Sequence, residues 1–163
     1  MTSTTEHFTV QLPTKRVAAD CLIFGTDGRF LVVEPIYKNT WDVPGGVSEV
    51  DESPRRTAQR EVAEELGLEV EPGPLLAVDW ISRRGDWTEV VAFLFDGGVV
   101  SIPATDLALQ AEEIRSARFV SLSEAEPLMT AWEYRRVAAA VEARSRQLTI
   151  YLEDGQGIQP ANG

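Results

Sequence analysis

Short apolar runs separated by turn residues fill much of the chain. Residues 17–24 form one such run, with Asp20 inside it, and residues 30–33 form the next. The Asp27-Gly28 pair between them is typical of a β-hairpin. Further strands are expected at about 75–82, 88–95 and 114–122, with a turn at 84–86. Residues 97–98 and 102–109 are interpreted as a loop region.

Two other segments have features of helices. Ser53 and Pro54 suit the N-cap and first position of a helix, and Gly67 suits its C-terminal end. Apolar side chains also recur at helical spacing between about 131 and 146, at Tyr134, Val137, Ala138 and Val141. Strands and helices together predict a mixed α+β fold.

The length of 163 residues predicts a single domain. Its core is expected at about 15–152, and the ends, 1–12 and 153–163, are expected to be loose. No apolar stretch is long enough to span a membrane, and no secretion signal is visible, so a cytoplasmic location is expected.

Charge and residue usage exclude several classes of function. The chain has 26 acidic and 15 basic residues, a net charge of −11, which argues against binding nucleic acid or anionic membranes. A small anionic substrate remains compatible if a local positive charge reverses the sign. One cysteine, Cys21, and one histidine, His7, leave no internal disulfide and argue against zinc centres and His-based nucleophilic catalysis.

The first expected helix carries a cluster of carboxylates. Glu61, Glu64 and Glu65 stand at i, i+3 and i+4, so they share one face. Such a cluster is often only a solvated helix face. Clustered oxygen ligands also suit Mg²⁺ or Mn²⁺, which can bridge phosphate oxygens and activate a water molecule. The second interpretation indicates metal-assisted chemistry on a phosphate ester or anhydride.

The whole segment from Gly46 to Leu68 resolves this choice. It reads Gly-x5-Glu-x7-Arg-Glu-Val-x-Glu-Glu-x-Gly-Leu and resembles, at every fixed position, the box motif of the Nudix hydrolases. The preceding Trp41-x-x-Pro44-Gly45 also looks like that family's approach to the box. The resemblance implies a Nudix-type α/β/α sandwich, in which a mixed sheet lies between helices and the box forms a loop-helix-loop. It also implies hydrolysis of a nucleoside diphosphate linked to another moiety, with Mg²⁺ or, as a substitute, Mn²⁺.

The resemblance further assigns metal ligands by position. Glu61, Glu64 and Glu65 would bind the metal, with the backbone carbonyl of Gly46 as a further ligand. Glu52 would brace the loop and could hold a second metal through water.

Catalytic roles are assigned in the same way. Arg60 would orient Glu61 through a salt bridge. Glu61 or Glu64 would instead hold the attacking water as general base, unless the base comes from outside the box, where Glu112 or Glu113 is the candidate.

The substrate is less well indicated. Lys38, Arg83 and Arg84 could contact phosphates, and Trp41, Trp87, Trp80 and Tyr37 could stack on a base, although each also fits an ordinary surface or packing role. A nucleoside triphosphate, an oxidised dNTP and a nucleotide sugar all stay open. The alternative to hydrolysis is a silent nucleotide-binding or sensor module on the same fold, and a homodimer stays open.

Overall fold

One mixed β-sheet organises residues 12–158, the part of the chain that the computed structural model describes. Within this part, seven strands follow the order β6-β2-β1-β5-β4-β7-β8, and β3 pairs with β1 beside them. β1 runs parallel to β5, and β4 parallel to β7, whereas the other pairs are antiparallel. The strands are β1 (Arg16–Gly25), β2 (Phe30–Pro35), β3 (Gly45–Val47), β4 (Leu75–Ile81), β5 (Val90–Val100), β6 (Ile114–Val120), β7 (Ile150–Glu153) and β8 (Gln156–Gly157).

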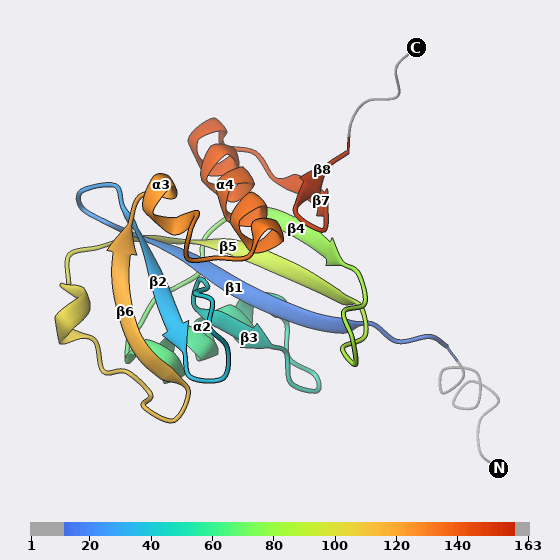
Figure 1. The fold of residues 1–163 in the computed structure, drawn as a ribbon, viewed down its shortest axis with the longest axis horizontal. Helices are drawn as coiled ribbons and strands as arrows, with labels where there is room; N and C mark the ends of the chain where they lie inside the picture. Colours follow the sequence, from blue (N-terminus) through green and yellow to red (C-terminus); the bar gives the residue numbers. More distant parts are fainter. Residues whose placement is uncertain (1–11, 159–163) are drawn as a thin grey trace.

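Helices cover both faces of the sheet (Figure 1). α2 (Pro54–Leu66) lies behind the sheet in this view, and α3 (Leu122–Ala125) and α4 (Ala131–Arg146) lie in front. A short 3₁₀ turn, η1 (Ala104–Asp106), leads toward β6. The predicted α+β arrangement, a mixed sheet between helices, is therefore confirmed. No helix in the described part of the chain is long and apolar enough to cross a membrane.

Strand β1 separates two apolar layers, because successive side chains of a strand point to opposite faces. Ala19, Cys21 and Ile23 belong to a buried cluster with Val62 and other residues of α2. The intervening side chains belong to the cluster on the other face, which includes Leu22, Phe24, Val137, Ala140 and Ala143. Asp20 shares that second face with Leu22, so an acidic side chain lies toward α4.

The capping residues of α2 are those predicted. Ser53 Oγ accepts a hydrogen bond from the Arg56 backbone N–H at 3.4 Å, and Pro54 begins the helix. Gly67 ends it with φ +62° and donates its N–H to Ala63. Ala58, Val62 and Leu66 pack into the core beneath the sheet, and Glu65 on the same helix is buried as well.

The loop predicted at residues 97–98 is wrong, because β5 continues through both glycines to Val100. Leu22 pairs with Asp96, but Phe24 pairs with Val99, so two glycines lie opposite one residue of β1. Gly98 has φ +74°, and a side chain on Gly97 would overlap Ile23. The glycine pair therefore marks a bulge inside a strand rather than the end of one.

The loose C-terminal end predicted from residue 153 is also wrong for residues 153–157. β7 and β8 form a hairpin that extends the sheet beyond β4. The turn is fixed by two hydrogen bonds, from Gly155 N–H to Asp79 and from Ser82 N–H to Asp154, both 3.0 Å. Residues 1–11, with His7, and 159–163 lie outside the described part.

The buried thiol of Cys21 leads to a first prediction. Cys21 is fully buried, and burial raises the pKa of its thiol to about 12. At pH 8 only about one molecule in 10⁴ carries the reactive thiolate. We expect no reaction of the native protein with iodoacetamide at pH 8, and one modified cysteine after unfolding in guanidinium, measured by mass spectrometry. Rapid modification of the native protein would contradict this burial.

Candidate active site

Gly45 and Gly46 lie where the sheet meets α2. They pair with Asp20 and Ala19 of β1, so β3 is fixed on the sheet. The Gly45 N–H donates a hydrogen bond to Glu65 Oε2 at 3.1 Å. A side chain on Gly46 would overlap the carboxylate of Glu61. Two of the predicted ligands therefore reach this glycine pair.

Arg60 links most of the acidic residues of the motif. Its Nε and one terminal nitrogen donate to the two carboxylate oxygens of Glu52, at 2.8 and 2.9 Å. The other terminal nitrogen donates to Glu61 at 2.9 Å and Glu64 at 3.0 Å. The salt bridge predicted between Arg60 and Glu61 is thus present. Arg60 also lowers the pKa of Glu52 to about 2, and Glu52 accepts a further hydrogen bond from Thr57. These contacts are compatible with a bracing role, which stays a prediction.

Burial separates the three clustered glutamates. Glu65 is only 6% exposed, and burial raises its pKa to about 8 against the opposing hydrogen bond from Gly45. Burial also raises the pKa of Glu61, although Arg60 acts in the opposite direction. Glu64 has a half-exposed side chain. The negative charge of two of these carboxylates is therefore costly in the protein alone.

The oxygen atoms of this cluster fit a hard divalent cation, although each of the three carboxylates already has a hydrogen-bond or salt-bridge partner. Within residues 12–158, no three acidic, histidine or cysteine side chains stand ready to hold a metal ion. Arg60 pairs with Glu61 and Glu64, and Glu65 accepts its hydrogen bond from Gly45. All the candidate donors are oxygens, as Mg²⁺ and Mn²⁺ prefer, and a cation would favour the charged forms that burial disfavours. Coordination by Glu61, Glu64, Glu65, Gly46 or Glu52 stays a prediction.

Glu113 lies on the same side of the molecule as the glutamates of α2. The segment before β6 docks on the C-terminal end of α2, through hydrogen bonds from Ala108 N–H to Leu66 and from Gln110 N–H to Glu65. Burial is the main cause of the raised pKa of Glu61, and the negative charges of Glu64 and Glu113 raise it further. Glu113 itself is exposed. Its position is compatible with a base from outside the motif, which stays a prediction.

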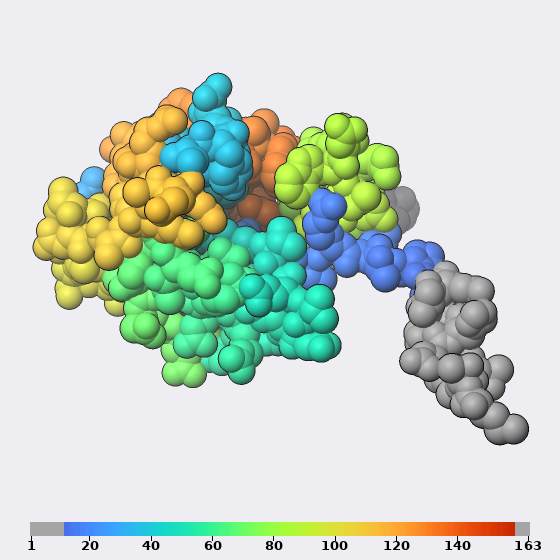
Figure 2. All heavy atoms as spheres, turned by 90° about the horizontal axis from the view of Figure 1, so that it is seen from below, coloured from blue at the N-terminus to red at the C-terminus, as the bar shows by residue number. Residues whose placement is uncertain are grey.

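A hollow lies beside this cluster (Figure 2). It is bounded by the cyan loop after β2, the yellow-green β4–β5 turn and the teal segment around β3. Lys38, in the first of these loops, is engaged by carboxylates, with Nζ 2.9 Å from Asp42 and 2.8 Å from Glu133. Trp41 is partly buried, and the Arg118 guanidinium lies 4.5 Å from its ring centre. Neither side chain is a free ligand-binding group as it stands.

The β4–β5 turn presents a more open set of side chains. Trp87 is 63% exposed, and Arg16 lies 4.9 Å from its ring centre. Arg84 donates to Asp154 at 2.8 Å and lies 4.9 Å from the ring centre of Trp132. Arg83 is exposed. Of the predicted base-stacking residues at this turn, Trp87 is the one that the structure leaves accessible.

Sequence reasoning missed a group of charged side chains packed between β1 and α4. Asp20, Glu133 and Arg136 are all buried. An acidic residue inside the apolar run 17–24 was the available signal, because a buried carboxylate needs a partner.

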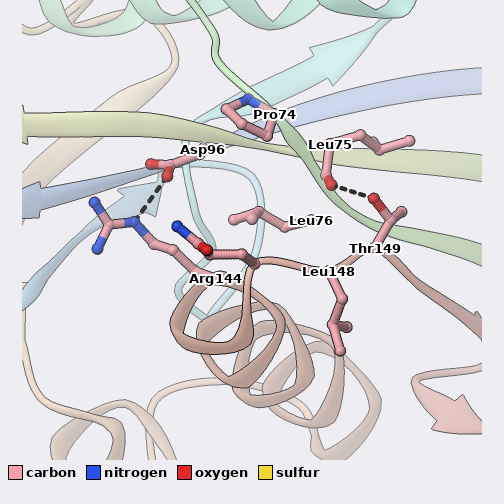
Figure 3. A pocket seen from close by; sticks show the side chains of 8 residues that line it. Pro74, Leu75, Leu76, Asp96, Arg144, Leu148 and Thr149 are labelled. Carbon is pink, nitrogen blue, oxygen red and sulfur yellow. Dashed lines mark hydrogen bonds and ion pairs between the residues drawn. The ribbon is translucent and has the colours of Figure 1, made fainter.

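Outside the hollow, the described part of the chain has cavities at two further places. One, of about 520 Å³, lies at the C-terminal end of α4 (Figure 3). The other, of about 380 Å³, lies beside the β7–β8 hairpin. No glutamate of α2 lines either cavity, so the chemistry of the motif belongs to neither.

Comparison with known proteins agrees with this geometry. Residues 14–141 match the family model described as NUDIX domain. A MutT-like protein of Streptomyces ambofaciens is 37% identical over 91 residues, which cover 53% of this chain and 56% of that protein. The chain thus spans little more than half the length of that relative.

Solved structures show the same fold. A MutT protein from Methanosarcina mazei has a TM-score of 0.68 and 25% identity, over 84% of this chain and 99% of the other. The NUDIX domain of Shewanella oneidensis NrtR, complexed with ADP ribose, has a TM-score of 0.67 and 18% identity, over 90% and 99%. At this identity, the second likeness concerns the fold alone.

Proposed function

This chain belongs to the Nudix family, and we propose that it hydrolyses a phosphoanhydride bond in a nucleoside diphosphate linked to another moiety. The observation that carries the proposal is the set of three glutamates on α2, two of which reach the Gly45–Gly46 pair. Arg60 ties the third to the same cluster. In this proposal, the carboxylate oxygens of this cluster are the metal ligands.

In the proposed mechanism, Glu61, Glu64, Glu65 and the Gly46 carbonyl would hold Mg²⁺, for which Mn²⁺ can substitute. The cation would supply the positive charge that draws phosphate oxygens and acidifies a water molecule. Glu61 or Glu64, whichever is not bound to the cation, or Glu113 from outside the motif, would take a proton from the attacking water as the water oxygen bonds to phosphorus. The bond from phosphorus to the bridging oxygen breaks, and the leaving phosphate keeps that electron pair.

Arg60 would have a positioning role in this reaction. Its bidentate pair with Glu52 holds the guanidinium, whose remaining nitrogen contacts Glu61 and Glu64. This arrangement would fix the direction in which the two carboxylates present their oxygens.

The moiety attached to the nucleoside diphosphate defines the substrate. We propose a nucleoside triphosphate, an oxidised dNTP or a nucleotide sugar, since MutT proteins and an ADP ribose-bound domain share the fold. Phosphate release from a panel of these compounds, coupled to a phosphatase where needed, tests the proposal. One substrate cleaved far faster than the others supports it. Tight nucleotide binding without cleavage would instead identify a silent binding module.

The physical properties of the chain support the remaining parts of the proposal. A net charge of −11 suits a small nucleotide, bound with its cation, better than nucleic acid or a membrane surface. We accordingly propose a small-molecule partner. We also propose a cytoplasmic location, which suits a chain whose one cysteine, Cys21, cannot form an internal disulfide.

Trp87 provides a test of substrate binding. If its exposed ring stacks on the base, Trp87→Ala loses about 1 kcal/mol or more of binding, which raises KM about fivefold or more. Tyr151→Ala, which removes an exposed aromatic ring from β7, is the control and should leave KM unchanged. Steady-state kinetics on two substrates with different bases measures the effect. An unchanged KM and substrate preference in Trp87→Ala would eliminate the stacking role.

A further inference from the structure

A single buried arginine of α4 contacts two acidic side chains beside the candidate active site. Arg136 is 4% exposed, and one terminal nitrogen lies 3.1 Å from Asp20 Oδ2 and 3.6 Å from Asp42 Oδ1. Asp20 belongs to β1, and Asp42 precedes β3. The guanidinium therefore joins the sheet to the segment that leads into the motif.

Asp20 packs directly against Gly45. The two residues are partners in the β1–β3 register, and a side chain on Gly45 would overlap the Asp20 carboxylate. The N–H of Gly45 is the donor to Glu65. A continuous set of contacts thus runs from Arg136 through Asp20 and Gly45 to Glu65, from one face of the sheet to the other.

Asp42 is held from several directions. Its backbone exchanges two hydrogen bonds with Val33 of β2, at 2.8 and 3.1 Å. Its carboxylate accepts from Lys38, whose ammonium also donates to Glu133 of α4. Arg136 and Lys38 are thus the two cations among the three carboxylates of Asp20, Asp42 and Glu133.

We propose that Arg136 is a positioning residue, which clamps residues 42–45 against the sheet. The clamp thereby fixes the Gly45 N–H, which donates a hydrogen bond to Glu65. Asp42 is the first residue of this segment, Asp20 pairs with its last residue, Gly45, and Arg136 contacts both aspartates. Without the guanidinium, both carboxylates lose a buried partner, and the segment loses its direct contact with α4, which leaves only the link from Asp42 through Lys38 to Glu133. The kinetic consequence rests on the proposed hydrolase function, whereas the structural one does not.

Arg144 provides a matched control on the same helix. It also pairs with an aspartate of the sheet, with Nε 2.8 Å from Asp96, but it lies beside the cavity at the other end of α4 (Figure 3). We expect Arg136→Met to lower kcat about tenfold or more, as for loss of a residue that orients a ligand, with KM unchanged within about twofold. Arg136→Lys should recover most of this loss, and Arg144→Met should keep kcat within about twofold of wild type.

A double-mutant cycle identifies the partner. If Arg136 acts through Asp20, Arg136→Met in an Asp20→Asn background should lower kcat by much less than in the wild type. Full additivity would overturn the proposal, and so would a loss confined to KM, which would make Arg136 a substrate contact. An equal loss in Arg144→Met would overturn it as well. If Arg136→Met does not fold, Arg136→Lys and Asp20→Asn carry the comparison.

Amide hydrogen exchange tests the clamp without any substrate. Residues 41–47 should lose protection in Arg136→Met but not in Arg144→Met, measured by mass spectrometry on folded protein. Unchanged protection in this segment would reject the clamp even if the enzyme is active. Lost protection in a protein that hydrolyses none of the substrates would support the clamp and reject the proposed function.

Discussion

Glu65→Gln is expected to lower kcat by at least about 100-fold, more than the loss usually seen when only an orienting residue is removed. The reason is that glutamine keeps the shape of the side chain but cannot provide the negative oxygen that a divalent cation binds. The fold should remain, because the amide oxygen of glutamine can still accept the hydrogen bond from Gly45. Burial raises the pKa of Glu65, so a neutral side chain suits this position. Steady-state kinetics and thermal unfolding together measure the effect.

The control for this prediction is Glu69→Gln, which neutralises an exposed glutamate just beyond α2. It should keep kcat within about twofold of wild type. Glu64→Gln should behave like Glu65→Gln. Turnover close to wild type in both the Glu64 and the Glu65 variants would remove these residues from the active site.

The second large effect concerns the two adjacent glycines. A side chain on Gly45 would meet the Ala19 carbonyl oxygen and Asp20 Cα, both at 2.5 Å, and this backbone cannot move away cheaply. Gly45→Ala should therefore lower the free energy of unfolding by about 3 kcal/mol or more. At Gly46 the obstacle is instead the flexible end of Glu61. Gly46→Ala should keep most of the stability and lose activity, because Glu61 is displaced.

Chemical denaturation and kcat, measured on both variants, separate these effects. Gly157→Ala, where an added methyl group meets no atom within 4 Å, is the control for both measurements. Equal losses of stability at Gly45 and Gly46, or normal turnover in Gly46→Ala, would contradict the described contacts.

The features that the sequence predicted well are those encoded locally. Both ends of α2 follow from Ser53, Pro54 and Gly67, whose effects act within one helical turn. The salt bridge between Arg60 and Glu61 is expected from the resemblance of this segment to the Nudix box, and both residues lie within that segment. For this reason the helix and its salt bridge could be predicted from 23 consecutive residues.

The features that the sequence did not predict depend on contacts between distant segments. β7 is four residues long and is stabilised by parallel pairing with β4, more than 70 positions earlier. In the sequence, Gly97 and Gly98 are typical of a loop, whereas the pairing of β5 with β1 shows that they form a bulge within a strand. From the sequence, Lys38 is interpreted as a cation free to contact phosphates, but in the fold α4 brings Glu133 beside it. No local pattern contains this information.

The most direct test of the central claim is the metal dependence of phosphoanhydride cleavage, followed by ³¹P NMR with dGTP and ADP-ribose as the first two substrates. We expect wild-type protein with Mg²⁺ to cleave at least one of them at the phosphoanhydride. Chelation with EDTA should abolish this cleavage, and Glu64→Gln should lack it. Cleavage that persists with EDTA and in Glu64→Gln would contradict the assignment of the glutamates of α2 as the catalytic centre.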